Sequence, residues 1–171
     1  MDIDEPGWPL IDDFFEQLAH DRKAETVRRY ARVRHRLYDY LDLDDMTTWL
    51  RPADATLLAA EREFCREGAF WTIFGTEALV RCLPGFVAVD LLPSGAAEAR
   101  MQVSVTGRLL KHLRRRRLVD RSMARPYNDA TRAVGRANLV LTYPDRVIPA
   151  SLQAAFDHID AAHPRPPESS E

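Results

Sequence analysis

Arginine side chains recur at helical spacing in the first quarter of the chain. Arg28, Arg32 and Arg36 follow one another at every fourth residue, with Arg29 beside them. On a helix this spacing places guanidinium groups about 6 Å apart along one face, and guanidinium forks match the oxygens of phosphate groups. The stripe therefore predicts a phosphate-binding surface. The alternative is a solvated helix face whose charges pair with the acidic N-terminal segment.

A second basic segment contains four consecutive arginines at positions 114–117. Arg108, Lys111 and Arg115 would share one helix face there. Cations near the C-terminus of a helix also stabilise its dipole, which would account for one or two of these charges. The remaining charges predict a surface that binds anions.

No combination of residues predicts catalysis or a metal site. The five histidines are scattered, and none has a Cys, Asp or Glu partner at a metal-ligand spacing. Cys65 and Ser104 stand in no sequence context that indicates an activated nucleophile. There is no glycine-rich phosphate loop. We therefore expect a protein without catalytic residues, metal or cofactor.

The elements that would carry the basic side chains are helices. Apolar residues recur at three- and four-residue spacing over residues 10–18, 23–41 and 97–118. Leu37 in the second of these segments and Leu109 and Leu113 in the third belong to the apolar stripes that we expect to be buried. Further helices are expected at 52–65, at 76–92 with a kink at Pro84, from 128–129 onward as a short helix, and at 151–162. The sequence thus predicts an all-α fold, a single helical-bundle domain of about five to seven helices.

Two segments leave their secondary structure open. Residues 69–74 (AFWTIF) are too short to distinguish a strand from a helix. Residues 139–143 (LVLTY) have the composition of a strand, so a short extended segment is the alternative to a helix there. The helical domain is expected to cover residues 1–163, followed by a disordered, proline-rich tail at 164–171.

Aromatic residues should dominate the core. Each fully buried large side chain stabilises the fold by roughly 1.5–3 kcal/mol. Cys65 and Cys82 are expected to be buried free thiols rather than a disulfide. The aromatic residues expected in the core are Trp49, Phe64, Phe70, Trp71, Phe74 and Phe86.

Composition and charge are those of an ordinary globular domain. Of the 171 residues, 46% are hydrophobic and 29% are charged, and the formal net charge of −2 neither predicts nor excludes a nucleic-acid partner. The N-terminus lacks the features of a signal peptide, and no apolar run reaches the roughly 20 residues that span a bilayer. A cytoplasmic protein without a membrane partner is expected.

Residues 13–42 and 83–120 resemble the N-terminal core-binding domain of tyrosine recombinases of the phage-integrase type. The first segment contains the run Thr26-Val27-Arg28-Arg29-Tyr30, similar to the Thr-Val-x-x-Tyr run that leads a long helix in that family. Residues 83–120 are similar to the later helices of the same domain, which end in a basic helix. The resemblance implies a small helical domain that clamps DNA, here without the family's catalytic domain. It also implies DNA contacts from Thr26, Arg28, Arg29 and Arg32, and from Arg100, Arg108 and Lys111.

Together these observations predict a non-enzymatic module that binds DNA or another nucleic acid, or accompanies a DNA-bound assembly, through its basic helices. The alternative is a helical module for protein–protein interaction or regulation, which could form a homodimer, because aromatic residues are favoured at interfaces. The nucleic-acid-binding residues predicted from the arginine patterns and the resemblance are Thr26, Arg28, Arg29, Arg32, Arg36, Arg100, Arg108, Lys111, Arg114 and Arg115.

Overall fold

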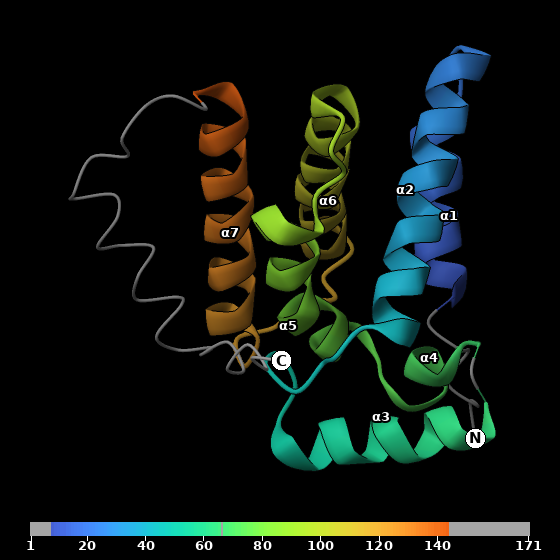
Figure 1. The fold of residues 1–171 in the computed structure, drawn as a ribbon, viewed down its shortest axis with the longest axis vertical. Helices are drawn as coiled ribbons and strands as arrows, with labels where there is room; N and C mark the ends of the chain where they lie inside the picture. The colour runs from blue at the N-terminus through green and yellow to red at the C-terminus, as the bar shows by residue number, and fades with distance from the viewer. Residues whose placement is uncertain (1–7, 66, 144–171) are drawn as a thin grey trace, which may run out of the picture.

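The computed structural model describes residues 8–65 and 67–143, and every regular element in these ranges is helical (Figure 1). The all-α prediction is confirmed. No strand occurs among the described residues. The elements are α1 (Trp8–Ala19), α2 (Ala24–Leu43), α3 (Pro52–Phe64), α4 (Ala69–Ile73), α5 (Thr76–Phe86), the 3-10 turn η1 (Val89–Leu91), α6 (Ala96–Arg115) and α7 (Ala124–Thr142).

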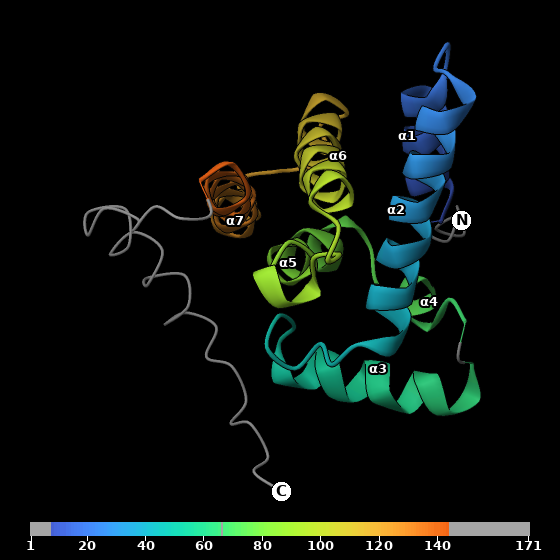
Figure 2. The same ribbon diagram turned by 45° about the horizontal axis from the view of Figure 1, so that its top comes forward.

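The long helices α1, α2, α6 and α7 are upright in the view of Figure 1, whereas Figure 2 shows α7 almost end-on, so α7 is inclined to α2. Helix α6 lies between α7 and α2 in both views, and α5 lies beside α6 and α7 (Figure 2). Helix α7 packs on α5 and α6, whereas α2 packs on α1 and α6. Helix α3 crosses one end of this bundle. No helix among the described residues is long and apolar enough to cross a membrane.

The core forms where the apolar stripes of these helices meet. On α2 the buried residues Tyr30, Val33 and Leu37 recur at three- and four-residue spacing. On α6 the predicted residues Leu109 and Leu113 are likewise buried in the same cluster. These stripes hold the opposite faces of α2 and α6 toward solvent, which is where their basic residues lie.

A buried carboxylate organises the corner between α2, α3 and α4. Asp42 accepts hydrogen bonds from the backbone N–H groups of Gly68 (2.9 Å) and Phe70 (3.4 Å), which leads the chain into α4. Gly68 has φ +79°, a left-handed conformation that suits glycine. Arg62 of α3 donates to the carbonyl of Leu41 at 2.8 Å. The end of α2 is thereby tied to both following helices.

Residues 139–142 are the last turn of α7 and Tyr143 follows it as the cap, so the extended segment suggested for 139–143 was wrong. Val134, Ala137 and Leu141 continue a helical apolar face that packs against Val87 and Val103. This packing outweighs the strand preference of the local composition. Helix α7 also begins at Ala124, earlier than predicted, and its 19 residues make it long rather than short.

Two other residues differ from their predicted environments. Phe64 was expected in the core and is 88% exposed. It lies six residues after the buried Leu58, which turns it by roughly 240° around α3 and away from the core. Cys65, which caps α3, is exposed as well, whereas Cys82 is buried as predicted.

Helix α5 continues through Pro84 for two residues and ends at Phe86, short of the predicted 92. The predicted helix at 151–162, the tail at 164–171 and the domain boundary at 163 lie outside the described residues.

Candidate nucleic-acid interface

Positive charge is concentrated in the α6–α7 hairpin. Residues 96–142, from the start of α6 to the end of α7, contain eleven Lys and Arg residues but three acidic residues, Glu98, Asp120 and Asp129. This segment therefore carries a formal charge of +8, and because the whole chain carries −2, the rest carries −10. The near-neutral total conceals a strong separation of charge along the chain.

Helices α6 and α7 run antiparallel. Arg100 near the start of α6 donates to the carbonyl of Leu141 near the end of α7, at 3.4 Å. Arg114 near the end of α6 lies over the ring of Tyr127 near the start of α7, with its guanidinium carbon 5.9 Å from the ring centroid. Midway, a Cβ on Gly107 would stand 3.3 Å from Val134 Cγ1, so glycine lets the two helices approach closely.

One face of α6 is a continuous exposed stripe. It contains Arg100, Ser104, Arg108, Lys111 and Arg115, all of which are exposed. Their spacing of three and four residues keeps them on one side over about 22 Å of helix. The stripe faces solvent because the opposite side of α6 is buried against the core.

An open groove of about 740 Å³ lies between α6 and α7. Its α6 wall presents only cations, and its α7 wall presents uncharged polar and aromatic groups. Among the described residues, no carboxylate lines the groove. Lys111 and Arg115 form no ion pair with any residue that the structure describes. The lining residues are Arg108, Lys111, Arg114 and Arg115 of α6 and Tyr127, Asn128 and Thr131 of α7.

The basic stripe of α2 is arranged differently, because carboxylates hold most of it. Glu98 of α6 forms ion pairs with Arg32 (3.2 Å) and Arg36 (3.8 Å), and Glu25 pairs with Arg29. Arg28 alone of the four is exposed without an ion pair to a described residue.

Arg36 is the most constrained cation of the α2 stripe. Its Nε donates to Gln102 Oε1 at 2.9 Å. Burial lowers the pKa of Arg36, while the Glu98 carboxylate acts in the opposite direction. The neutralisation of the α2 stripe comes from α6 rather than from the N-terminal helix, because Asp12 of α1 pairs with Arg34 instead.

The predicted residues therefore fall into two groups. Arg108, Lys111, Arg114 and Arg115 converge on the groove, and Arg100 lies farther along the same helix face. The other group lies on α2, where Thr26 is half-buried; its members are Thr26, Arg28, Arg29, Arg32 and Arg36.

The sequence interpretation missed the α7 wall. Tyr127, Asn128 and Thr131 carry no charge, and the start of α7 was placed too late to put Tyr127 on a helix. The three- and four-residue spacing of these side chains was the available signal.

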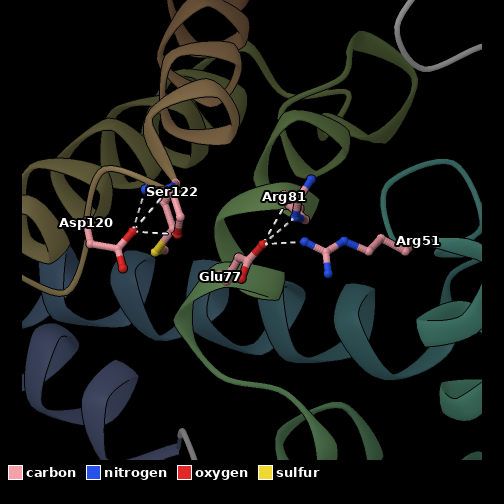
Figure 3. A network of polar contacts seen from close by, with 6 residues as sticks. Arg51, Glu77, Arg81, Asp120 and Ser122 are labelled. Atoms are coloured by element: carbon pink, nitrogen blue, oxygen red, sulfur yellow. Dashed lines mark hydrogen bonds and ion pairs between the residues drawn. The ribbon is translucent and has the colours of Figure 1, made fainter.

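A second hollow, of about 350 Å³, lies near the opposite face of α7, between α5 and the start of α7, and its charges are internally paired. In Figure 3, Arg51 and Arg81 both point to Glu77, whose Oε1 accepts at 3.2 and 2.9 Å respectively. Asp120 Oδ1 accepts from the Ser122 hydroxyl at 2.6 Å. Because these charges already have partners, this hollow is a weaker anion site than the α6–α7 groove. Its lining residues are Arg81, Pro84, Ser122, Arg125, Pro126 and Asp129.

His112 is the one histidine buried among the described residues. Its Nε2 has no hydrogen-bond partner there, and its ring lies 5.3 Å from that of Phe14. Burial lowers the pKa of His112, the nearby Arg116 and Arg115 lower it further, and Asp13 opposes them. No group of three or more His, Cys, Asp or Glu side chains in the described ranges could hold a metal ion.

Comparison of the chain with protein-family models, with curated proteins and with solved structures gave no match. The resemblance to the core-binding domain of tyrosine recombinases accordingly stays a prediction.

Proposed function

We propose that the protein is a non-enzymatic nucleic-acid-binding module that acts through the α6–α7 hairpin. The observation that carries this proposal is the gathering of four cations around one groove whose described lining contains no carboxylate. Such a module fits a cytoplasmic protein.

The electrostatics of the groove favour a polyanionic ligand. Cations held close together without counter-charges repel one another, and bound phosphate groups relieve that repulsion. Three of the four groove cations are arginines, whose planar forks bind phosphate oxygens in two places at once. The stripe extends beyond the groove to Arg100, so a chain of phosphates could follow α6 rather than end at one point.

Helix α2 contributes less to this proposal than α6. Glu98 already neutralises Arg32 and Arg36, which leaves Arg28 as the α2 cation most available to a ligand. The two segments that resemble the recombinase domain include α2 and α6, which pack against each other. A DNA-associated role of that kind is therefore part of the proposal.

Binding should be measured by fluorescence anisotropy with a labelled oligonucleotide at several salt concentrations. We expect affinity to fall steeply with salt, because each phosphate contact releases counterions. The double variant Lys111→Gln/Arg115→Gln should bind more weakly, and its log–log salt slope should be shallower by about 0.7–0.9 for each phosphate that it no longer neutralises.

The matched control is Arg121→Gln/Arg132→Gln. It removes the same charge from exposed positions of the hairpin that do not line the groove. Equal reductions in affinity in the two double variants would show that net charge, not the groove, governs binding. Undetectable or salt-independent binding by the unmodified protein would contradict the proposal.

A second candidate function is self-association, which exposed apolar side chains favour. Phe64 at the end of α3 is 88% exposed and Leu43 at the end of α2 is 70% exposed, and the hydrogen bond from Arg62 to the Leu41 carbonyl joins these two helix ends. Large apolar side chains left in water are typical of interaction sites when they cluster. Light scattering after size exclusion tests this candidate, and a monomer at all concentrations would count against it.

A further inference from the structure

We infer that the α6–α7 groove takes a single-stranded segment of nucleic acid, with its phosphates against α6 and its unpaired bases against α7. The inference rests on the proposed function and specifies its ligand. It comes from three features of the groove: the different chemistry of its two walls, the aromatic group at its α7 side, and the position of α6 between two other helices.

The two walls suit different parts of a nucleotide. The α6 wall offers Arg108, Lys111 and Arg115, which match phosphates. The α7 wall offers the amide of Asn128, which can donate to and accept from base edges, and the hydroxyl oxygen of Thr131, which can accept from them. The Thr131 hydroxyl donates to the carbonyl of Tyr127 at 2.8 Å, so its oxygen stays available as an acceptor. A ligand made of phosphate alone would leave the α7 wall unused.

Arg114 and Tyr127 supply two planar groups at the groove, a guanidinium and an aromatic ring, which together we call the platform. The Arg114 guanidinium lies over the half-buried Tyr127 ring, at a distance typical of a cation–π contact. Unpaired bases stack on aromatic rings and on guanidinium planes in proteins that bind single strands. This platform adjoins the phosphate-binding cations, as the alternation of base and phosphate along a strand requires.

A duplex cannot use both walls. The major groove of B-DNA is about 12 Å wide and admits one α-helix. Helix α6 is flanked by α7 on one side and by α2 on the other, where Arg108 donates to Tyr30 at 3.2 Å. Packed helices lie about 8–10 Å apart and each is about 10–12 Å across. The helices α2, α6 and α7 together are therefore too wide to enter the major groove. A duplex would touch the α6 cations only with its outer phosphates, and its paired bases would not reach α7.

The size of the groove fits a short part of a strand. Its volume of about 740 Å³ falls within the range of roughly 300–1,000 Å³ in which proteins hold small organic ligands. We therefore expect the groove to hold about one or two unpaired nucleotides, with the neighbouring phosphates following the α6 stripe toward Arg100.

The test compares a single-stranded oligonucleotide with the duplex of the same length at one salt concentration, by anisotropy on the full chain. The single strand should bind more tightly. Asn128→Ala and Tyr127→Leu should each weaken single-strand binding, by about fivefold or more where base stacking is removed. Their salt slopes should stay unchanged, since neither removes a phosphate contact. Duplex binding should respond to Lys111→Gln/Arg115→Gln but not to the α7 variants.

Asn138→Ala is the matched control, because Asn138 is exposed on α7 but does not line the groove. Asn128 is exposed, so its variant tests the inference even if Tyr127→Leu, which reaches the core cluster, impairs folding. Equal or tighter binding of the duplex, or an Asn128→Ala variant that behaves like Asn138→Ala, would overturn the inference and leave the proposed function intact. No binding of either form would overturn both.

Discussion

Gly85 occupies the closest approach of α5 to the loop after α2. A Cβ at this position would overlap Tyr40 Oη and Trp49 Nε1 and would stand 2.6 Å from Trp49 Cε2. Tyr40 cannot simply swing away, because its hydroxyl donates to the carbonyl of Cys82 at 2.8 Å inside the core. The absence of a side chain at Gly85 is therefore what lets α5 pack at this depth.

Gly85→Ala should destabilise the protein by about 1–3 kcal/mol or more, through overpacking. Gly135→Ala is the matched control, since a Cβ at Gly135 in α7 meets nothing within 4 Å. That change should stabilise the fold by about 0.5–1 kcal/mol, because alanine favours helix over glycine. Urea denaturation of both variants measures the difference, and a Gly85→Ala variant as stable as the parent would contradict the packing described here.

His112 should make the fold sensitive to mild acid. Its pKa is lower in the folded than in the unfolded chain, mainly because of burial. The stability that the neutral His112 contributes is therefore complete above its pKa in the unfolded chain, which is about 6.5. This contribution is lost as the pH falls through its lower pKa in the folded protein. His112→Gln removes this titration and should reduce the drop in unfolding free energy between pH 7.5 and pH 5.

The readout for His112 is the difference between two pH values, so any constant cost of placing glutamine in the core cancels. His20→Gln is the control, because the His20 side chain is 79% exposed. An unchanged acid dependence in the His112 variant would assign the acid sensitivity to other groups.

Residue patterns predicted the core better than its edges. The apolar stripes of α2 and α6 follow from spacing alone, and Leu37, Leu109 and Leu113 are buried as expected. Phe64 was misplaced because hydrophobicity does not reveal which side of α3 meets the core. That side is fixed by the corner that Asp42 and Arg62 build, a contact between separate elements that no local pattern contains.

At the scale of elements, the pairing of helices determines which arginines are available. The sequence predicted cationic faces on both α2 and α6, and the residues assigned to each face do lie together on one helix. It could not show that Glu98 of α6 lies against Arg32 and Arg36, because that contact depends on how two distant helices pack. For the same reason the α7 wall of the groove was not anticipated.

Glu98→Gln should release Arg32 of α2 and remove the ion pair of Arg36, whose Nε still donates to Gln102. We expect tighter nucleic-acid binding and a log–log salt slope steeper by about 0.7–0.9 for each arginine that then reaches a phosphate. Anisotropy titrations against salt measure both effects. Glu63→Gln, an exposed carboxylate of α3, controls for the change in net charge.

Glu98→Gln in an Arg32→Gln/Arg36→Gln background shows whether Glu98 weakens binding by holding these two arginines or by its own negative charge. If Glu98 acts by holding those arginines, its removal should have no further effect there. A gain in affinity that persists in this background would mean that Glu98 acts only through its own charge, and the described pairing would not limit binding.

At the scale of the whole molecule, the separation of charge would orient the protein toward the polyanion that the proposed function assigns to it. The α6–α7 hairpin carries +8 and the remainder carries −10. Fields of this kind orient a molecule before contact and raise the rate of encounter at low salt. The hairpin should therefore approach a nucleic acid first.

The same imbalance has a consequence for a strand that many copies occupy. Proteins with a large positive total neutralise nucleic acids, and the resulting complexes condense. Each copy of this chain brings a net charge of −2, so a densely covered strand would become more negative than the bare one. Neighbouring coated strands would repel each other and stay dispersed.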